Sequence, residues 1–317
     1  MTYFANLGTV ELSVIFLFGL AALLLGAEAL VTNSVRLAMR LNISKVIIGL
    51  TIVAFGTSMP EFVVSIVSVI KGSFDISLGN IIGSNIANIG LVLGLSAIFR
   101  KVDVPEHILK VDLPFLILIS LIFWFFCSNG FVELHEAFIL LGLFFFYIWY
   151  MSFNSKEKNN EEVGIKEKKE ISIAFILLSL IVGIILLSIG ADWIVGSGVE
   201  LSHRLGISEL FIGLTAVAVG TSLPELATSV VAAIKKEGSI SLGNIIGSNI
   251  FNTLLVIGSA GMIKPLTVNQ NVISLQLPFM IGMTLLLVPF LYTNRKVTRI
   301  EAIILLILYA IFIYISF

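Results

Sequence analysis

Long apolar stretches separated by short polar breaks run through the whole chain. The pattern predicts ten membrane-spanning helices, at residues 11–39, 44–70, 78–99, 112–128 and 134–153 in the first half and at 171–202, 208–234, 242–263, 272–292 and 299–316 in the second. Segments of this length match the roughly 20 apolar residues that a helix needs to cross the hydrocarbon core of a bilayer. The predicted fold class is therefore an all-α polytopic membrane protein.

The polar positions inside these apolar segments occur twice. Matching positions are separated by the same number of residues as Gly56 and Gly220, and we call this spacing the repeat offset. The sequence GTSMPE at 56–61 returns as GTSLPE at 220–225, and ISLGNIIGSNI at 76–86 returns unchanged at 240–250. We predict two five-helix repeats, residues 1–153 and 171–317, whose most similar parts are 44–99 and 208–263. Because five is an odd number, the two repeats must cross the membrane in opposite directions. Inverted repeats are typical of secondary transporters, which bind their substrate near the membrane midplane.

The basic residues test this topology. Sixteen of the 19 Lys and Arg residues fall in the loops that follow the first, third, fifth, seventh and ninth segments, and the other side carries only Lys71, Arg204 and Lys264. The positive-inside rule makes the Lys-rich side cytoplasmic. We therefore expect a multi-pass protein of the cell membrane with both termini outside. Residues 154–170, which hold Lys and Glu in equal number, are expected to form a solvated cytoplasmic linker.

Composition narrows the functional classes. The chain is 58% hydrophobic and 12% charged, with a net charge of −1 and a mean hydropathy of +1.08. It has no basic patch interleaved with aromatic residues, so we expect no nucleic-acid partner. Cys127 is the only cysteine, which excludes an internal disulfide and a cysteine-based metal site. We expect no protein partner and a functional monomer.

Each repeat carries a proline inside an apolar segment. Pro60 lacks an amide hydrogen and crowds the carbonyl group of Gly56, so the helix must kink or open there. Pro224 has the same relation to Gly220. Backbone carbonyl groups released at membrane depth are tolerated only where they line a protected cavity. The two prolines therefore predict two broken helices around a polar site.

Carboxylates and hydroxyls next to these breaks form a set of oxygen ligands. Thr57 precedes Glu61 by four residues, and Thr221 precedes Glu225 by four, so each pair shares one helical face. Hard cations such as Ca²⁺ take roughly six to eight oxygen ligands, carboxylates among them. The two glutamates together carry the two negative charges that a desolvated Ca²⁺ needs. Backbone carbonyl groups seven residues before the glutamates lie near the same faces, at Ala54 and Ala218.

The segments that follow add neutral polar groups. Asn80, Ser84 and Asn88 recur every four residues on one helical face, and the repeat offset gives a matching set of Asn244, Ser248 and Asn252. Amides and hydroxyls suit Na⁺ sites, or hydrogen bonds that hold the glutamates in place. For Asn85 and Asn249 the sequence leaves two alternatives open, further ion ligands or hydrogen bonds between helices.

Other matched residues lie outside this set. Glu28 and Asp192 are acids at equivalent places in the first and sixth segments. They either join the ion path or bond to a neighbouring helix. Four glycines of the third segment allow close helix approach, at positions 79, 83, 90 and 94.

The paired GTS-hydrophobe-PE motifs, each followed by GNIIGSNI, resemble the two α-repeats of the cation/Ca²⁺ antiporter superfamily. Within it the similarity is to the sodium/calcium exchangers of archaeal and bacterial type. The motifs cover segments two, three, seven and eight, and the ten-segment layout covers the whole chain. The resemblance implies a core of these four helices, with the first and sixth segments long, tilted and peripheral, sliding across the core during transport.

The resemblance also implies how the ion ligands divide. The Ca²⁺ site would use the carboxylates of Glu61 and Glu225 and the carbonyl groups of Thr57 and Thr221. The remaining positions implied for Na⁺ or for a central site comprise the carbonyl groups of Ala54 and Ala218 and the side chains of Ser84, Ser248, Asn88 and Asn252. Ser58 and Ser222, which follow the threonines, would be secondary ligands.

Asn252 departs from the family pattern, because many relatives carry Asp at that position. The amide lowers the charge of the site and leaves its centre neutral. It argues against a K⁺-dependent exchanger, since an added monovalent ion would favour an extra acid. A bound water could occupy the centre instead.

Together these features predict a secondary antiporter that exchanges Na⁺ for Ca²⁺ by alternating access and exports Ca²⁺ with inward Na⁺. No prosthetic group is expected, and the ions are the substrates. An H⁺/Ca²⁺ antiporter with the same two glutamates is the main alternative, and a passive cation channel is another. An enzyme is not expected, because no histidine lies near the hydroxyls to act as a base.

Overall fold

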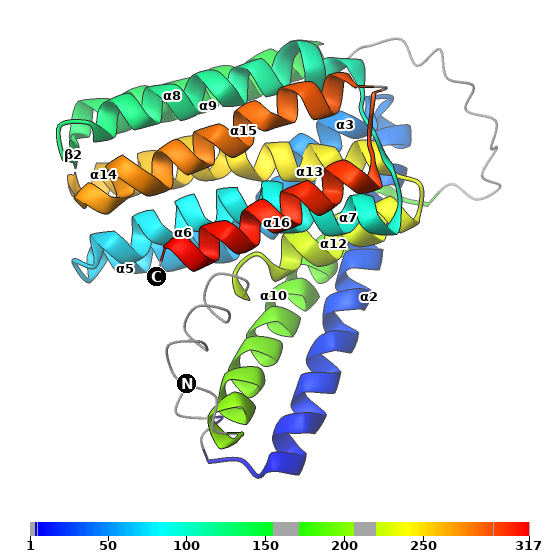
Figure 1. The fold of residues 1–317 in the computed structure, drawn as a ribbon. Coiled ribbons are helices and arrows are strands. Elements are labelled where there is room, and N and C mark those ends of the chain that lie inside the picture. The colour runs from blue at the N-terminus through cyan, green and yellow to red at the C-terminus, as the bar shows by residue number, and fades with distance from the viewer. Residues whose placement is uncertain (1–3, 5, 155–170, 206–219, 294, 317) are drawn as a thin grey trace.

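The computed structural model describes residues 4, 6–154, 171–205, 220–293 and 295–316, and these residues are almost entirely helical (Figure 1). Seven of the described helices are long and apolar enough to cross a membrane, and an eighth crossing results if the bent pair Lys45–Thr57 and Met59–Ile70 is one span. The prediction of a helical, multi-pass membrane protein is thus confirmed. Of the predicted segment 208–234, residues 208–219 lie outside the described residues, as do 155–170 of the linker.

The described helices and strands have the following bounds: α2 Thr9–Leu41, α3 Lys45–Ile48, η1 Gly49–Val53, α4 Ala54–Thr57, α5 Met59–Ile70, α6 Phe74–Ala87, η2 Asn88–Leu93, α7 Gly94–Phe99, β1 Val102–Asp103, η3 Ile108–Asp112, α8 Leu113–Cys127, β2 Phe131–Val132, α9 Leu134–Asn154, α10 Ile173–Arg204, α12 Leu223–Ile234, α13 Gly238–Phe251, η4 Asn252–Val256, α14 Ile257–Ile263, β3 Leu266–Thr267, η5 Val272–Gln276, α15 Leu277–Tyr292, β4 Lys296–Val297 and α16 Arg299–Ile315. The η segments are π-helical turns inside longer helices.

The two longest helices, α2 and α10, pack against each other along their length and run at a steep angle to the other helices (Figure 1). Glycines make this contact possible. A methyl group built on Gly190 would lie 2.6 Å from the backbone nitrogen of Leu23, and one on Gly26 would lie 2.8 Å from the carbonyl oxygen of Gly183. Such close backbone approach is typical of helix pairs in membranes. The two helices therefore form a tightly joined pair at the edge of the molecule.

The other helices form a bundle around α13, whose residues are almost all buried. Two short strand pairs tie loops together outside the helices. Strand β1 pairs with β4, and β2 pairs with β3, both antiparallel. The first pair joins the loop before η3 to the loop before α16, and the second joins the loop before α9 to the loop after α14. The pairs thus link loops that the predicted topology assigns to the same side.

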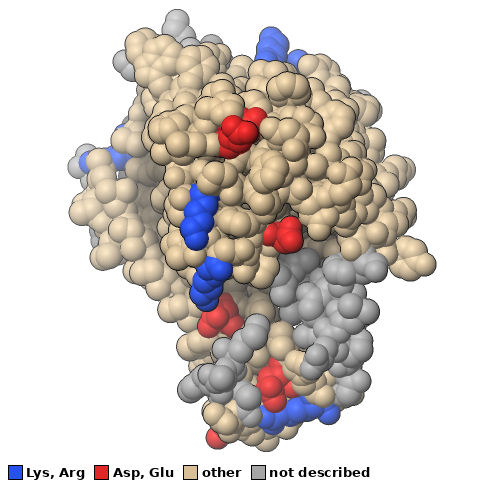
Figure 2. Space-filling view, turned by 90° about the vertical axis from the view of Figure 1, so that its left-hand side faces the viewer, with Lys and Arg blue, Asp and Glu red and all other residues tan. Residues whose placement is uncertain are grey.

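Charged side chains are sparse on the end of the molecule where α5 and the chain itself end (Figure 2). This is the end that the sequence predicts to carry few lysines and arginines.

Two helices begin with a hydroxyl residue that caps the first turn. The Thr298 hydroxyl accepts the Glu301 amide of α16, and the Ser172 hydroxyl accepts the Phe175 amide of α10.

Candidate ion-binding site

The span formed by α3, η1, α4 and α5 breaks at Ser58, next to Pro60, and bends by 47°. Ser58 has φ −85° and ψ 7°, and Ser222, which precedes α12, has φ −86° and ψ 6°. Both breaks therefore have the same backbone conformation. The proline occupies the first turn of the new helix, where its missing amide hydrogen costs nothing. Glu61 and Glu225 follow in these first turns, and both are fully buried.

The two glutamates belong to one hydrogen-bonded network, because Ser58 of the first break bonds to Glu225 and Ser84 lies within bonding distance of both Glu61 and Thr221. Each uses one oxygen for bonds to hydroxyls. Ser58 Oγ donates to Glu225 Oε1 at 2.8 Å, and the longer contacts come from Ser84 to Glu61 Oε1 and from Ser248 to Glu225 Oε1, both 3.5 Å. The second carboxylate oxygen of each glutamate has no hydrogen-bond partner among the described residues. Each glutamate thus has one buried carboxyl oxygen available to a ligand.

The threonines bind across the two halves of the chain. Thr57 Oγ1 donates to Asn244 Oδ1 at 3.0 Å, and Thr221 Oγ1 donates to Asn80 Oδ1 at 3.3 Å. They also lie 3.5 Å and 3.4 Å from the hydroxyls of Ser248 and Ser84, in that order. Each broken helix is therefore bonded to the helix that carries the matching polar face of the other half.

Two residues of this network are absent from the sequence prediction. Ser65 accepts the amide of Asn80, and Ser229 accepts the amide of Asn244, both at 3.0 Å. Each serine lies four residues after a glutamate, and the repeat offset relates one serine to the other, so the same spacing rule could have found them. These bonds orient the two asparagines, whose oxygens then accept the threonine hydroxyls.

Asn88 and Asn252 each begin a π-helical turn, η2 and η4. Wide turns of this kind are rare and are frequently found at functional sites. The amide nitrogens of these asparagines are bonded, to Asn249 Oδ1 at 3.0 Å and to Asn85 Oδ1 at 3.2 Å. Their side-chain oxygens are buried and have no partner among the described residues. Among the predicted ligands, two carboxyl oxygens and two amide oxygens are therefore buried without a partner among the described residues.

Asn85 and Asn249, for which the sequence leaves two alternatives open, both form hydrogen bonds between helices. Asn85 Nδ2 donates to Thr253 Oγ1 at 3.0 Å, and the backbone carbonyl oxygen of Asn85 accepts from Asn249 Nδ2 at 3.2 Å. Together with the Asn252 bond, these contacts join α6 to α13 and η4. Asn85 is thus a positioning residue for the Asn252 amide.

We expect Asn85→Ala to lower the thermal stability of the protein in detergent. The change leaves Thr253 and the Asn252 amide without partners, and each orphaned buried group costs about 1–3 kcal/mol. The exposed Asn271→Ala is the control and should leave the unfolding temperature unchanged. Equal unfolding temperatures for the two variants would show that Asn85 does not join these helices.

Some predicted ligands stand apart from this arrangement. Ala218 lies outside the described residues, and the Ala54 carbonyl oxygen already accepts the Ser58 amide at 3.0 Å. Ser222 Oγ is buried with no partner among the described residues, although its counterpart Ser58 binds Glu225.

Glu28 is outside the site and binds Lys235 instead. Methyl groups built on Gly90 and Gly94 would meet α16, whereas Gly79 and Gly83 have no described neighbour within 4 Å.

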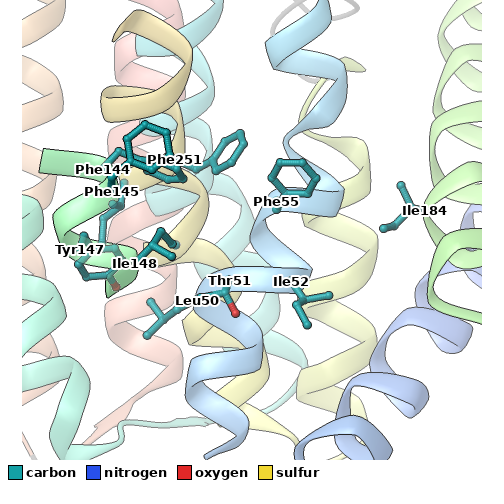
Figure 3. Close-up of a pocket in the computed structure, with 12 residues that line it drawn as sticks. Leu50, Thr51, Ile52, Phe55, Phe144, Phe145, Tyr147, Ile148, Ile184 and Phe251 are labelled. Carbon is teal, nitrogen blue, oxygen red and sulfur yellow. The ribbon is translucent and has the colours of Figure 1, made fainter. Parts of the chain in front are cut away.

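An apolar cavity of about 350 Å³ lies beside the site, between α4 with η1, α9, α10 and α13 (Figure 3). Phe55, Phe251 and Ile184 face it from three of these elements, and its lining includes none of the predicted ion ligands. The hydroxyl residues of its lining are Thr51 and Tyr147, whose hydroxyls already donate to the Ile47 carbonyl oxygen and to Asp112 Oδ1. The cavity is therefore a gap between helices and not part of the ion site.

Fold and site together define a helical membrane protein with two buried glutamates in a network of hydroxyl and amide side chains. The profile of the sodium/calcium exchanger protein family matches residues 12–153 and 175–317. The chain belongs to this family, and it is a cation/Ca²⁺ antiporter and not an enzyme.

Individual relatives agree with this assignment. The sodium/calcium exchanger MaX1 of Methanosarcina acetivorans is 32% identical and the membrane protein MJ0091 of Methanocaldococcus jannaschii is 37% identical, covering 96% and 93% of this chain and 97% and 95% of their own lengths. The structure of the sodium-calcium exchanger NCX_Mj soaked with zero Na⁺ and Ca²⁺ has a TM-score of 0.85 at 35% identity, covering 98% of this chain and 100% of that chain. A second NCX_Mj structure, soaked with both ions, has a TM-score of 0.82 and covers 95% of this chain and 97% of that chain.

Proposed function

We propose that this protein exports Ca²⁺ in exchange for Na⁺ by alternating access. The observation that carries the proposal is the group of four buried oxygens without hydrogen-bond donors: Glu61 Oε2, Glu225 Oε2, Asn88 Oδ1 and Asn252 Oδ1. Buried acceptors are normally satisfied, and an unpaired one costs free energy. Cations held between the two repeats would supply partners for these oxygens and balance the charge of the two carboxylates.

The ligands divide between Ca²⁺ and Na⁺. Ca²⁺ binds between the carboxylates of Glu61 and Glu225, with the carbonyl groups of Thr57 and Thr221 completing the site. Na⁺ binds on either side of it, one ion near each glutamate, and the amides of Asn88 and Asn252 face the centre. The outer ligands of the two Na⁺ positions are the carbonyl groups of Ala54 and Ala218 and the hydroxyls of Ser84 and Ser248, with Ser58 and Ser222 as secondary ligands.

Competition for the glutamates couples the two ions. Both ions need the same two carboxylates, so one must leave before the other loads. An occupied site is close to neutral, whereas an empty one holds two unbalanced charges away from water, which is costly. The helices can therefore change position readily only when ions are bound. NCX_Mj, whose name specifies sodium-calcium exchange, supports this choice of ions.

The topology that this mechanism needs is ten spans in two inverted repeats, residues 1–153 and 171–317, with a cytoplasmic linker at 154–170. Both termini lie outside the cell membrane, and the monomer is the working unit. Several features support the inverted arrangement. The starts of the π-helical turns η2 and η4 are separated by the repeat offset, and so are those of η3 and η5. The strand pairs and the distribution of Lys and Arg agree with it.

Uptake of radioactive Ca²⁺ into Na⁺-loaded vesicles tests the coupling ion. We expect uptake to stop when an ionophore collapses the Na⁺ gradient and to continue when a protonophore collapses the H⁺ gradient. The reverse result would show H⁺/Ca²⁺ antiport through the same glutamates. Uptake that ignores both gradients and shows no counterflow would indicate a passive channel.

A further inference from the structure

One ion pair joins the peripheral helices to the bundle. Lys235, directly after α12, donates to Glu28 Oε1 on α2 at 2.7 Å and to Thr32 Oγ1 at 2.8 Å. The Glu28 side chain is 63% exposed and that of Lys235 is 32% exposed, so the pair lies at the surface of the protein. A surface pair can open and close readily because it is worth only about 0–1 kcal/mol.

Both partners of this pair have equivalents in the other half of the chain. The repeat offset matches Glu28 with Asp192 on α10 and Lys235 with Lys71, directly after α5. Asp192 and Lys71 are both exposed, and neither side chain has a hydrogen bond or ion pair to another described residue. The sequence thus contains the same acid–lysine pair twice, and the described structure contains it once.

The packing of the helices that carry the two acid–lysine pairs is also unequal. Helix α2 packs closely on α12, whereas α10 makes no comparable contact with α5 within the described residues. Next to α10 there is instead the apolar cavity, into which Ile184 points (Figure 3). Methyl groups built on Gly56 and Gly220, the glycines before the two breaks, would both meet α10 first, at Ile184 and Val195. The α2–α10 pair therefore lies asymmetrically on a bundle whose sequence is repeated.

We propose that Glu28–Lys235 and Asp192–Lys71 are two alternating latches that hold the α2–α10 pair at opposite ends of its movement. The proposal rests on the proposed function, because it needs the inverted repeats and the movement of α2 and α10. The Glu28–Lys235 latch is closed in this structure and lies on the predicted cytoplasmic side. The Asp192–Lys71 latch, on the outer side, closes when the pair moves to its other position and the first latch opens.

The latches set the balance between the outward-open and inward-open states. Loss of one closed latch shifts this balance by the contribution of one surface ion pair, a factor of up to about fivefold. A closed cytoplasmic latch holds the outward-open state and a closed outer latch holds the inward-open state. Glu28→Gln should therefore favour the inward-open state and Asp192→Asn the outward-open state. The apparent Ca²⁺ affinities at the two membrane faces, compared in right-side-out and inside-out vesicles, should therefore shift by about threefold to fivefold in opposite directions.

Three further variants identify the interaction. The double neutralisation E28Q/D192N should return the affinity ratio to the wild-type value, and the exchanged pair E28K/K235E should restore it where Glu28→Lys alone disturbs it. Glu200→Gln is the control, because Glu200 is an acid of α10 that binds Arg204 of the same helix. Equal shifts in the same direction for Glu28→Gln and Asp192→Asn would overturn the proposal.

A cross-linking experiment tests the latch that is open in this structure. In a Cys127→Ala background, Lys71→Cys with Asp192→Cys should be joined by a short bifunctional thiol reagent, and the joined protein should lose exchange until a reductant releases it. Absence of the cross-link in protein that exchanges ions would overturn the proposal. Failure of the wild-type protein to exchange Na⁺ for Ca²⁺ would instead contradict the proposed function, and the cross-link can be measured independently of it.

Discussion

Replacement of Glu225 by glutamine is expected to reduce Na⁺-dependent Ca²⁺ uptake by at least about 100-fold. The change keeps the size of the side chain and lets its carbonyl oxygen accept the Ser58 hydroxyl, but it removes one of two buried charges. Removal of one partner from a buried ionic interaction costs about 3–5 kcal/mol, and each 1.4 kcal/mol is a factor of about ten in affinity. Glu61→Gln should have the same effect, because the two glutamates act together.

Uptake of radioactive Ca²⁺ into Na⁺-loaded vesicles measures this effect. The matched control is Glu133→Gln, which neutralises a glutamate that is 54% exposed in the loop before α9 and should transport normally. Size-exclusion chromatography of the variants checks that all of them fold. Transport at wild-type rates by either glutamine variant would contradict the assignment of the glutamates to the ion site.

Gly247→Val is expected to destabilise the protein and to stop transport. A methyl group at Gly247 of α13 would lie 2.6 Å from the Leu50 carbonyl oxygen and 2.8 Å from the Ala54 side chain. The first of these contacts is with backbone, which cannot rotate away, so η1 and α4 must move from α13. That movement would break the bond between Thr57 and Asn244, and overpacking of this kind costs about 1–3 kcal/mol or more.

Thermal unfolding in detergent, monitored as the loss of monomeric protein, measures the destabilisation. We expect the unfolding temperature to decrease by at least about 5 °C. Gly282→Val is the control, because it also places a β-branched residue inside a membrane helix, and no described atom lies within 4 Å of a methyl group at Gly282. Equal unfolding temperatures for the two valine variants would show that η1 is free to move from α13.

The residues of the site could be found from the sequence because spacing along a helix fixes which side chains share a face. Thr57, Glu61 and Pro60 define one broken helix by themselves, and the repeat offset supplies the second. The contact between Asn80 and Thr221 forms only when the two halves of the chain pack together, so residue spacing does not predict it. No spacing within one helix predicts a contact between halves.

The π-helical turns at Asn88 and Asn252 could not be predicted. The residues that follow them, Ile-Gly-Leu and Thr-Leu-Leu, have no local preference for a wide turn. The turns occur where each asparagine amide is bonded to the opposite helix, so tertiary contacts accompany them. The roles of Asn85 and Asn249 were undecided for the same reason, since a buried amide serves equally well as a ligand or as a bond between helices.

The asymmetry of the structure was also beyond the sequence. Ser58 and Ser222 occupy equivalent places in motifs that differ only by Met59 and Leu223, yet of the two only Ser58 bonds to a glutamate among the described residues. A repeated sequence predicts equivalent contacts, and a particular conformation satisfies only some of them. Differences between equivalent residues therefore report the state of the molecule and not its composition.

The close backbone contact between α2 and α10 has a mechanical consequence. Because the backbones of the two helices touch at Gly26 and Gly190, we expect α2 and α10 to move together as one body. One body with one direction of motion cannot uncover the ions on both faces of the membrane at once. Bulky residues at these glycines would separate the helices and create a continuous leak, in which Na⁺ flows down its gradient without moving Ca²⁺. We therefore expect tight coupling of Na⁺ flow to Ca²⁺ transport to depend on the absence of side chains at these two glycines.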